Sequence, residues 1–239
     1  MEDPTGYLTE PEEPDSALSK GFVNPLDIFN YLSPSAWINA AIAEITGFDV
    51  IGWMSEAVTG DWAAMYRFGD AMGKLGLCLR QLGANITMGS IEMDLHWDGN
   101  AGDAALRYFF DLGNAVGRQE ESLDEVKERY QKAALGAFLL ADELGNIAQA
   151  MADRAIIAGI AAAGGAALSE TGAGAVVGYG VAALIAVDIL NLANRASTKI
   201  NLFGGSIMAL FGFIMDGSQQ GGDLSRIPLP GASYDHPAV

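Results

Sequence analysis

Two long stretches of helical periodicity, separated by the short segment Trp97-Asp98-Gly99, constrain the fold more than any other feature of the sequence. In the first stretch, residues 62–95, apolar side chains recur mostly at spacings of three and four, which is typical of one helix face. Asn100 is a common helix N-cap residue and opens the second stretch. Because two long helices joined by a short turn pack side by side and antiparallel, we expect a helical hairpin over residues 61–152.

Glycines are frequent in the first helical stretch. Each one lowers helix propensity by about 1 kcal/mol relative to alanine. Since the apolar pattern continues through them, we expect these glycines to mark close packing between helices rather than breaks in the helix. The glycines of this stretch are Gly69, Gly73, Gly76, Gly83 and Gly89.

Residues 153–215 form an apolar region that is rich in glycine and alanine. From Ala155 to Val187 the only charged residue is Glu170, within the turn-like segment Ser169-Glu170-Thr171-Gly172. We therefore expect a second helical hairpin, followed by a third apolar segment over residues 200–215. Gly174 and Gly178, at Gly-x-x-x-Gly spacing, are expected where two helices pack closely.

The two ends of the chain differ from these helical regions. Residues 1–24 are acidic, contain three prolines and have few apolar side chains, so we expect a disordered arm. Residues 25–60 carry the start and stop signals of short helices. Residues 216–239 are rich in Gly and Pro and are expected to form a flexible tail. Since no alternation typical of strands persists anywhere, the chain is predicted to be all-α.

The composition excludes some classes of partner. A net charge of −17 repels phosphate backbones and anionic lipid heads, so we expect no binding to nucleic acid. The N-terminus is acidic and lacks an apolar run, so we expect no cleavable signal peptide. The single cysteine, Cys78, cannot form an intramolecular disulfide, and its apolar neighbours predict that it is buried.

Patterns that would support catalysis are nearly absent from the sequence. Asp94, His96 and Asp98 suggest a metal site by composition, but residues two apart on a helix point about 200° apart and do not converge on one ion. Acidic pairs such as Glu120-Glu121 lie in a charge-dense helical segment that is typical of a solvent-facing surface. We therefore expect no metal, no cofactor and no enzymatic activity.

Residues 61–150 resemble the Trp-x-Gly superfamily of type VII secretion substrates, the early-secreted-antigen-like helical hairpins of actinobacteria and firmicutes. The resemblance rests on Trp97 and Gly99, which lie between two helices of comparable length. In that family the turn is one half of a composite export signal. The other half is an aromatic-x-x-x-acid element near the end of the second helix, for which Phe138 and Asp142 are the counterparts here.

The resemblance implies a non-enzymatic helical protein that is secreted without a cleavable signal peptide and acts by protein–protein association, outside the cell or at its surface. The implied partners are the type VII secretion machinery and a second helical protein, in a homo- or hetero-oligomer. Trp97, Gly99, Phe138 and Asp142 would be read by the machinery. The additional helices before and after the hairpin resemble those of longer actinobacterial members.

Two alternatives stay open. Trp97 could serve only to hold the two helices together, with Gly99 supplying a turn residue of positive φ. The charge-free runs 155–169 and 171–187 could enter a membrane, which would make the chain a membrane-inserting or pore-forming helical protein. Each run is shorter than the ~20 residues that span a bilayer, and the small side chains favour packing against protein.

Overall fold

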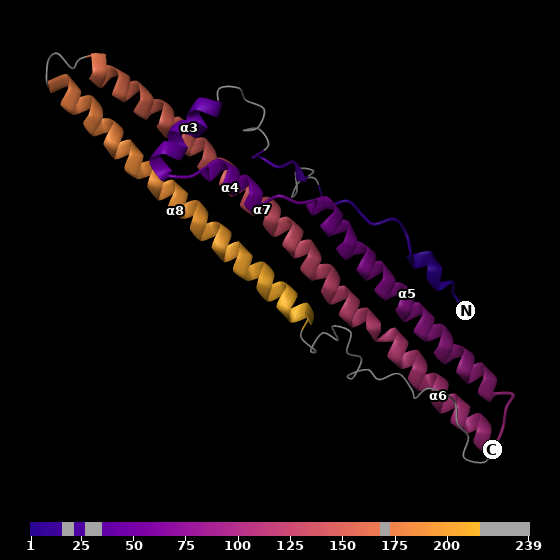
Figure 1. The fold of residues 1–239 in the computed structure, drawn as a ribbon. Coiled ribbons are helices and arrows are strands. Elements are labelled where there is room, and N and C mark those ends of the chain that lie inside the picture. Colours follow the sequence, from indigo (N-terminus) through magenta and orange to yellow (C-terminus); the bar gives the residue numbers. More distant parts are fainter. Residues whose placement is uncertain (16–21, 27–34, 168–172, 216–239) are drawn as a thin grey trace. The chain divides into compact units, whose positions relative to one another are not determined.

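The computed structural model describes residues 1–15, 22–26, 35–167 and 173–215, and within these ranges it contains helices and no strand (Figure 1). This confirms the predicted all-α class. In chain order the elements are η1 (Pro4–Tyr7), α3 (Ser35–Thr46), α4 (Val50–Ala57), α5 (Trp62–Asp94), α6 (Asn100–Gly117), α7 (Gln119–Ala167) and α8 (Ala173–Met215).

The chain divides into two compact units. The first contains Met1–Asp15, Ala63–Ala134 and the end of α8 from Ile207 onward. The second contains Ser16–Trp62 and Leu135–Ser206.

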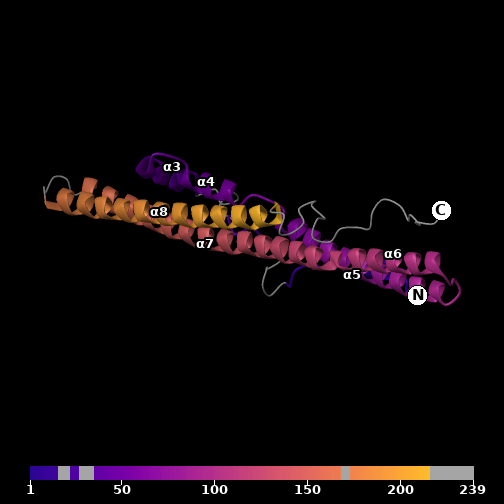
Figure 2. The same cartoon turned by 90° about the horizontal axis from the view of Figure 1, so that it is seen from below.

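In the first unit, α5 runs antiparallel to α6 and the start of α7, and the two views in Figures 1 and 2 both place them side by side. The sequence predicts one uninterrupted second helix, but the structure interrupts it at Arg118, where α6 ends and α7 begins. The Arg118 N–H still donates to the Asn114 carbonyl oxygen at 3.0 Å, so the chain direction continues across the break.

Gly69, Gly76 and Gly83 of α5 lie close to the backbone of α6 or α7, as predicted, whereas Gly73 and Gly89 have only side-chain atoms as neighbours. The helix is continuous through all five. A Cβ atom added to Gly83 would collide with the Gly113 carbonyl oxygen of α6, and one added to Gly69 would lie 2.9 Å from the Lys127 carbonyl oxygen of α7. The two backbones therefore meet where side chains are absent on the facing side. Cys78, on the same helix, is buried as expected.

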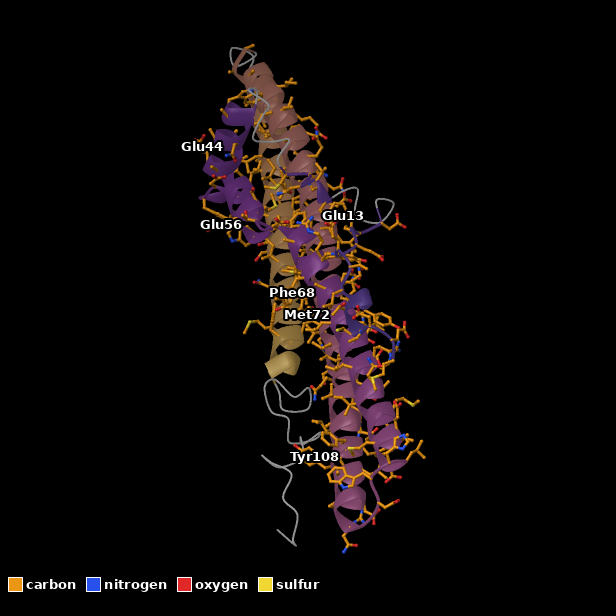
Figure 3. The ribbon with its side chains drawn as sticks, turned by 90° about the vertical axis from the view of Figure 1, so that its right-hand side faces the viewer. Glu13, Glu44, Glu56, Phe68, Met72 and Tyr108 are labelled. Atoms are coloured by element: carbon orange, nitrogen blue, oxygen red, sulfur yellow. The ribbon has the colours of Figure 1, made fainter. Side chains whose placement is uncertain are left out.

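Aromatic contacts join three helices of the first unit. Phe68 of α5, labelled in Figure 3, packs on Tyr130 of α7 with ring centroids 4.7 Å apart. Tyr130 in turn makes an edge-to-face contact with Phe211 at the end of α8, at 5.8 Å. Such offset and edge-on arrangements are favoured by aromatic rings, so they help to hold the end of α8 in this unit.

In the second unit, α7 and α8 run antiparallel and side by side in both views (Figures 1 and 2). Large side chains with almost no exposure come from α3, α4, α7 and α8, and include Ile42, Val50, Met54, Phe138, Leu144, Met151 and Ile189. Unlike the prediction of a separate segment over 200–215, α8 is one continuous helix from Ala173 to Met215. Its leucines and isoleucines continue the helical pattern, and no proline interrupts them.

Two predictions for this region rest partly on positions that the structure leaves undescribed. The turn Ser169-Glu170-Thr171-Gly172 lies outside the described residues. Gly174 and Gly178 both lie on α8, and Gly178 is half-buried, but the surroundings of Gly174 are also outside the described residues. Close packing at these two glycines therefore stays a prediction.

Candidate functional site

The turn between α5 and α6 contains Trp97 and Gly99, the first half of the predicted signal. Gly99 adopts φ +95°, a conformation that L-residues rarely enter, which confirms its predicted positive φ. Gly99 rather than Asn100 is the N-cap of α6, and its carbonyl oxygen accepts the Asp103 N–H at 3.0 Å. The left-handed turn at Gly99 redirects the chain one residue earlier than the sequence predicts, so Asn100 becomes the first helical residue.

Trp97 is partly exposed, with 43% of its surface accessible. Its carbonyl oxygen lies so close to Gly102 that a Cβ atom there would collide with it. The ring also reaches the start of α6, since its Cγ atom would lie 3.6 Å from that Cβ position. Trp97 therefore packs partly on α6, as a residue that holds the turn would, and keeps accessible surface that a partner can contact.

Three further exposed apolar side chains precede the turn on α5. Met88, Ile91 and Leu95 are spaced by three and four residues, so they follow one face of the helix and its C-terminal turn. The sequence places Ile91 and Leu95 in the apolar pattern of the helix, but the structure leaves them exposed. We call Met88, Ile91, Leu95 and Trp97 the turn group.

Phe138, the aromatic half of the second predicted signal element, is buried in the core of the second unit. Only 2% of its surface is accessible. It makes edge-to-face contacts with Trp62 at 6.2 Å and Phe22 at 5.8 Å between ring centroids. Asp142 lies one helical turn further along α7 and is half-buried. In this conformation a receptor cannot touch Phe138, because its ring is enclosed by core side chains.

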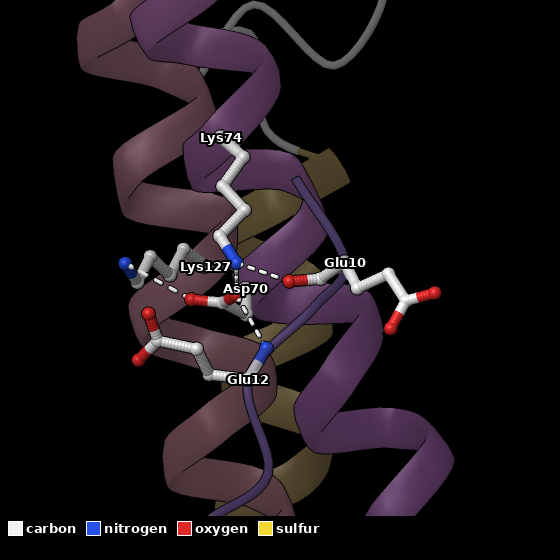
Figure 4. Close-up of polar contacts among 5 residues, drawn as sticks. All are labelled: Glu10, Glu12, Asp70, Lys74 and Lys127. Atoms are coloured by element: carbon white, nitrogen blue, oxygen red, sulfur yellow. Dashed lines mark hydrogen bonds and ion pairs between the residues drawn. The ribbon is translucent and has the colours of Figure 1, made fainter. Parts of the chain in front are cut away.

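A buried carboxylate on α5, Asp70, was not singled out by the sequence. It is 4% exposed and lies 2.9 Å from Lys74 Nζ and 3.4 Å from Lys127 Nζ (Figure 4). The Glu12 N–H donates to the same carboxylate at 2.9 Å, and Lys74 donates to the Glu10 carbonyl oxygen. Asp70 and Lys74 therefore hold the backbone of the N-terminal segment against α5.

The pKa of Asp70 reflects this environment. Burial opposes ionisation, but the Glu12 N–H, the hydrogen bond from Lys74 and the charges of Lys74 and Lys127 outweigh it. The pKa of Asp70 is therefore lowered from its ordinary value of 3.8. The carboxylate stays charged at neutral pH, which suits a structural anchor rather than a proton donor or acceptor.

The N-terminal segment 1–15 differs from the disordered arm that the sequence predicts. Besides the Asp70 contacts, Arg67 pairs with Glu13 at 2.8 Å, and the Asn85 side chain donates to the Glu2 carbonyl oxygen at 2.6 Å. These bonds order the segment without the apolar burial that the sequence lacks. In the sequence, Asp70 and Lys74 have the i,i+4 spacing of an ordinary ion pair on a helix surface. This spacing does not indicate that the carboxylate also accepts the backbone N–H of Glu12.

Two shallow grooves of about 330 and 400 Å³ line α5 in the first unit. Their walls are mostly small or apolar, and they include Gly83, Gly113 and Met93. Among the residues that the structure describes, no group of three His, Cys, Asp or Glu side chains gathers as a metal site.

The chain was compared with protein-family models, curated proteins and solved structures. No protein-family model, curated protein or solved structure matches the chain. The turn group, the Asp70 anchor and the exposed surfaces of the helices are therefore the features on which a function can be argued.

Proposed function

We propose that the protein is a type VII secretion substrate that acts by protein–protein association, without catalysis. The observation that carries this proposal is the partly exposed Trp97, held beside Gly99 at the turn of a closely packed helical hairpin. A turn that only reverses the chain needs no large aromatic side chain on its surface. Exposed aromatic residues commonly anchor protein interfaces, because they bury a large apolar area when a partner covers them.

The remainder of the turn group supports the same proposal. Met88, Ile91 and Leu95 extend the exposed apolar surface along α5 toward Trp97. Five residues before Met88, α5 packs closely on α6 through the contact between Gly83 and Gly113. A partner would therefore meet a rigid platform and lose little conformational freedom on binding. We propose a second helical protein or a component of the secretion machinery as that partner, and export without a cleavable signal peptide.

The second signal element needs a modified role under this proposal. Because Phe138 is enclosed by Trp62 and Phe22, it acts by shaping the second unit, and Asp142 is the member of the pair that a receptor can approach more directly. A change at Phe138 would then reduce export through loss of the fold. A change at Asp142 would reduce export by removing a carboxylate that the receptor contacts.

The proposal is tested by replacing Trp97 with alanine and measuring the secreted fraction in a host with a type VII system. We expect Trp97→Ala to lower secretion severalfold while the helical circular-dichroism signal is kept. Trp37→Ala is the matched control, because Trp37 is a tryptophan of similar exposure (52%) in the second unit, which does not contain the turn.

Equal secretion of the Trp97→Ala variant and the wild-type protein would refute a recognition role for the turn. A collapse of the circular-dichroism signal would instead assign Trp97 the role of holding the two helices together. Equal losses for Trp37→Ala and Trp97→Ala would show that export does not read the turn specifically.

A further inference from the structure

The N-terminal segment 1–15 docks on one face of α5, yet its own side chains stay largely outside the core. None of them is buried, and only Pro4, Tyr7 and Pro14 are half-buried. The segment is held instead by polar contacts at α5 positions separated by whole helical turns. We call this face of α5 the track, and its members are Arg67, Asp70, Lys74, Asn85 and Gly89.

The track does not need the segment in order to stay intact. Without the Glu12 N–H, Asp70 still lies 2.9 Å from Lys74 Nζ and 3.4 Å from Lys127 Nζ, so no buried charge is left unpaired (Figure 4). The hairpin packs through a different face of α5, where Gly76 approaches α7. Lys74 is two residues from Gly76 and therefore points about 160° away from that contact.

The charge of the track is opposite to that of the chain as a whole. Between Trp62 and Ile91, α5 carries three basic residues and one acidic residue, although the net charge of the protein is −17. Lys127 of α7 adds a further positive charge beside Asp70. The segment on the track is acidic, with Glu2, Asp3, Glu10, Glu12, Glu13 and Asp15. This complementarity favours an acidic ligand along α5.

One end of the track is only partly used by the N-terminal segment. Met1 borders the shallow groove of about 400 Å³, but 85% of its surface stays accessible. Its methyl carbon reaches Gly89, where an added Cβ atom would lie 3.1 Å away. We call this groove the end groove, and its apolar walls include Ile86, Met93 and Phe109. The groove therefore has room for a bulkier apolar side chain than the one beside it.

We propose that the track binds an extended acidic segment of a partner protein, which displaces residues 1–15 and places a bulky apolar side chain in the end groove. The N-terminal segment then acts as a resident ligand that occupies the track in the free protein. A partner that makes the same polar contacts and also fills the end groove buries apolar area that Met1 leaves exposed. This role does not rest on the export proposal.

The experiment measures binding of synthetic peptides by fluorescence anisotropy. The first peptide has the sequence of residues 1–15, with the label at its C-terminal end, and the second carries Met1→Phe. The receptors are the wild-type chain and an open variant, which is a full-length chain with residues 2–15 replaced by a Gly/Ser sequence of equal length. Circular dichroism checks that the helices of the open variant are kept.

We expect the open variant to bind the first peptide at least tenfold more tightly than the wild-type chain does. In the wild-type chain the tethered segment competes at an effective concentration on the order of millimolar. The Met1→Phe peptide should bind the open variant at least threefold more tightly than the first peptide. Methylation of the Glu12 nitrogen keeps every charge but removes the donor to Asp70, so it should weaken binding at least tenfold.

Two asparagines provide a matched control on the protein side. Asn85→Ala in the open variant removes the donor to the Glu2 carbonyl oxygen without changing the charge, and should weaken binding severalfold. Asn114→Ala changes an exposed asparagine of α6 that lines the other groove, and should leave binding unchanged. Because the track and the peptide are oppositely charged, higher salt concentration should weaken binding.

Absence of peptide binding to the folded open variant would overturn the proposal, as would equal binding of the methylated and unmethylated peptides. Equal affinities of the Met1 and Met1→Phe peptides would refute the role of the end groove. Loss of the helical signal in the open variant would show that α5 requires the segment, which also contradicts the proposal.

If light scattering shows that the wild-type chain forms a dimer and the open variant does not, the ligand of the track is the N-terminal segment of a second copy. The assignment to a separate partner is then wrong. Secretion is not measured in any of these tests, so their outcome is separate from that of the export proposal.

Discussion

The two helical hairpins use the same small residues for different purposes. In the first hairpin, formed by α5 with α6 and the start of α7, Gly83 and Gly113 lie where two backbones meet. In the second hairpin, formed by α7 with α8, Gly159 and Gly180 have no atom within 4 Å of the position that a Cβ would take. A glycine within a helix therefore indicates close packing only where another part of the chain lies on the same side. Elsewhere it removes bulk from an exposed surface.

The largest effect is expected in the buried part of the second hairpin. Phe138→Ala should lower the free energy of unfolding by about 3–5 kcal/mol, because it removes a fully buried ring and leaves a cavity. Leu139→Ala, the adjacent but exposed position on α7, should change it by less than about 0.5 kcal/mol. Urea denaturation measures both. A cost below about 1 kcal/mol for Phe138→Ala would show that this hairpin lacks the tight core described here.

A smaller but more specific effect separates the glycines of the two hairpins. Gly83→Ala should destabilise the protein by about 1–3 kcal/mol, because its methyl group would collide with the Gly113 carbonyl oxygen. Gly180→Ala should stabilise the protein by up to about 1 kcal/mol, because alanine favours helix and the space beside it is open. Thermal unfolding of the two variants provides the comparison. If both variants lose the same stability, the glycines do not differ in the way that the structure indicates.

The last comparison concerns polar contacts, whose effect on stability depends on pH. The folded pKa of Asp70 lies below its ordinary value of 3.8, so its stabilising contribution is present above that value and is lost as the pH falls through the folded pKa. Asp70→Asn should lower stability at pH 7 by about 1–3 kcal/mol and reduce the loss of stability on acidification. Unfolding curves recorded from pH 7 to pH 3 test this.

Glu143→Gln is the control in the second hairpin, where Glu143 pairs with Lys199 at 2.8 Å and both side chains are 42% exposed. An exposed pair contributes less than about 1 kcal/mol, so this variant should resemble the wild-type protein. Identical pH profiles for Asp70→Asn and the wild type would contradict the anchoring role of Asp70.

Local signals predicted much of the fold. Apolar spacing gave the all-α class and a continuous α5, and the persistence of that spacing through Gly69 and Gly83 identified close packing. The positive φ of Gly99 also follows from local chemistry, because a tight turn between two helices favours a residue without a Cβ.

Features that depend on distant partners could not be predicted in the same way. Nothing near Asp70 in the sequence points to the backbone of Glu12, which is 58 residues away. The enclosure of Phe138 by Trp62 and Phe22 likewise arises only when separate segments meet. The proposed export and partner roles remain predictions, since a partner's contacts are not encoded in local periodicity.

The anchor at Asp70 recognises the N-terminal segment through its main chain, since it uses the Glu12 N–H and the Glu10 carbonyl oxygen rather than side chains. Docking is therefore largely indifferent to which side chains occupy these two positions. Proline at position 12 is the exception, because it has no N–H to donate. The side chains of Glu10 and Glu12 are therefore not needed for this anchor, and replacing either one should leave the path of the chain along α5 unchanged.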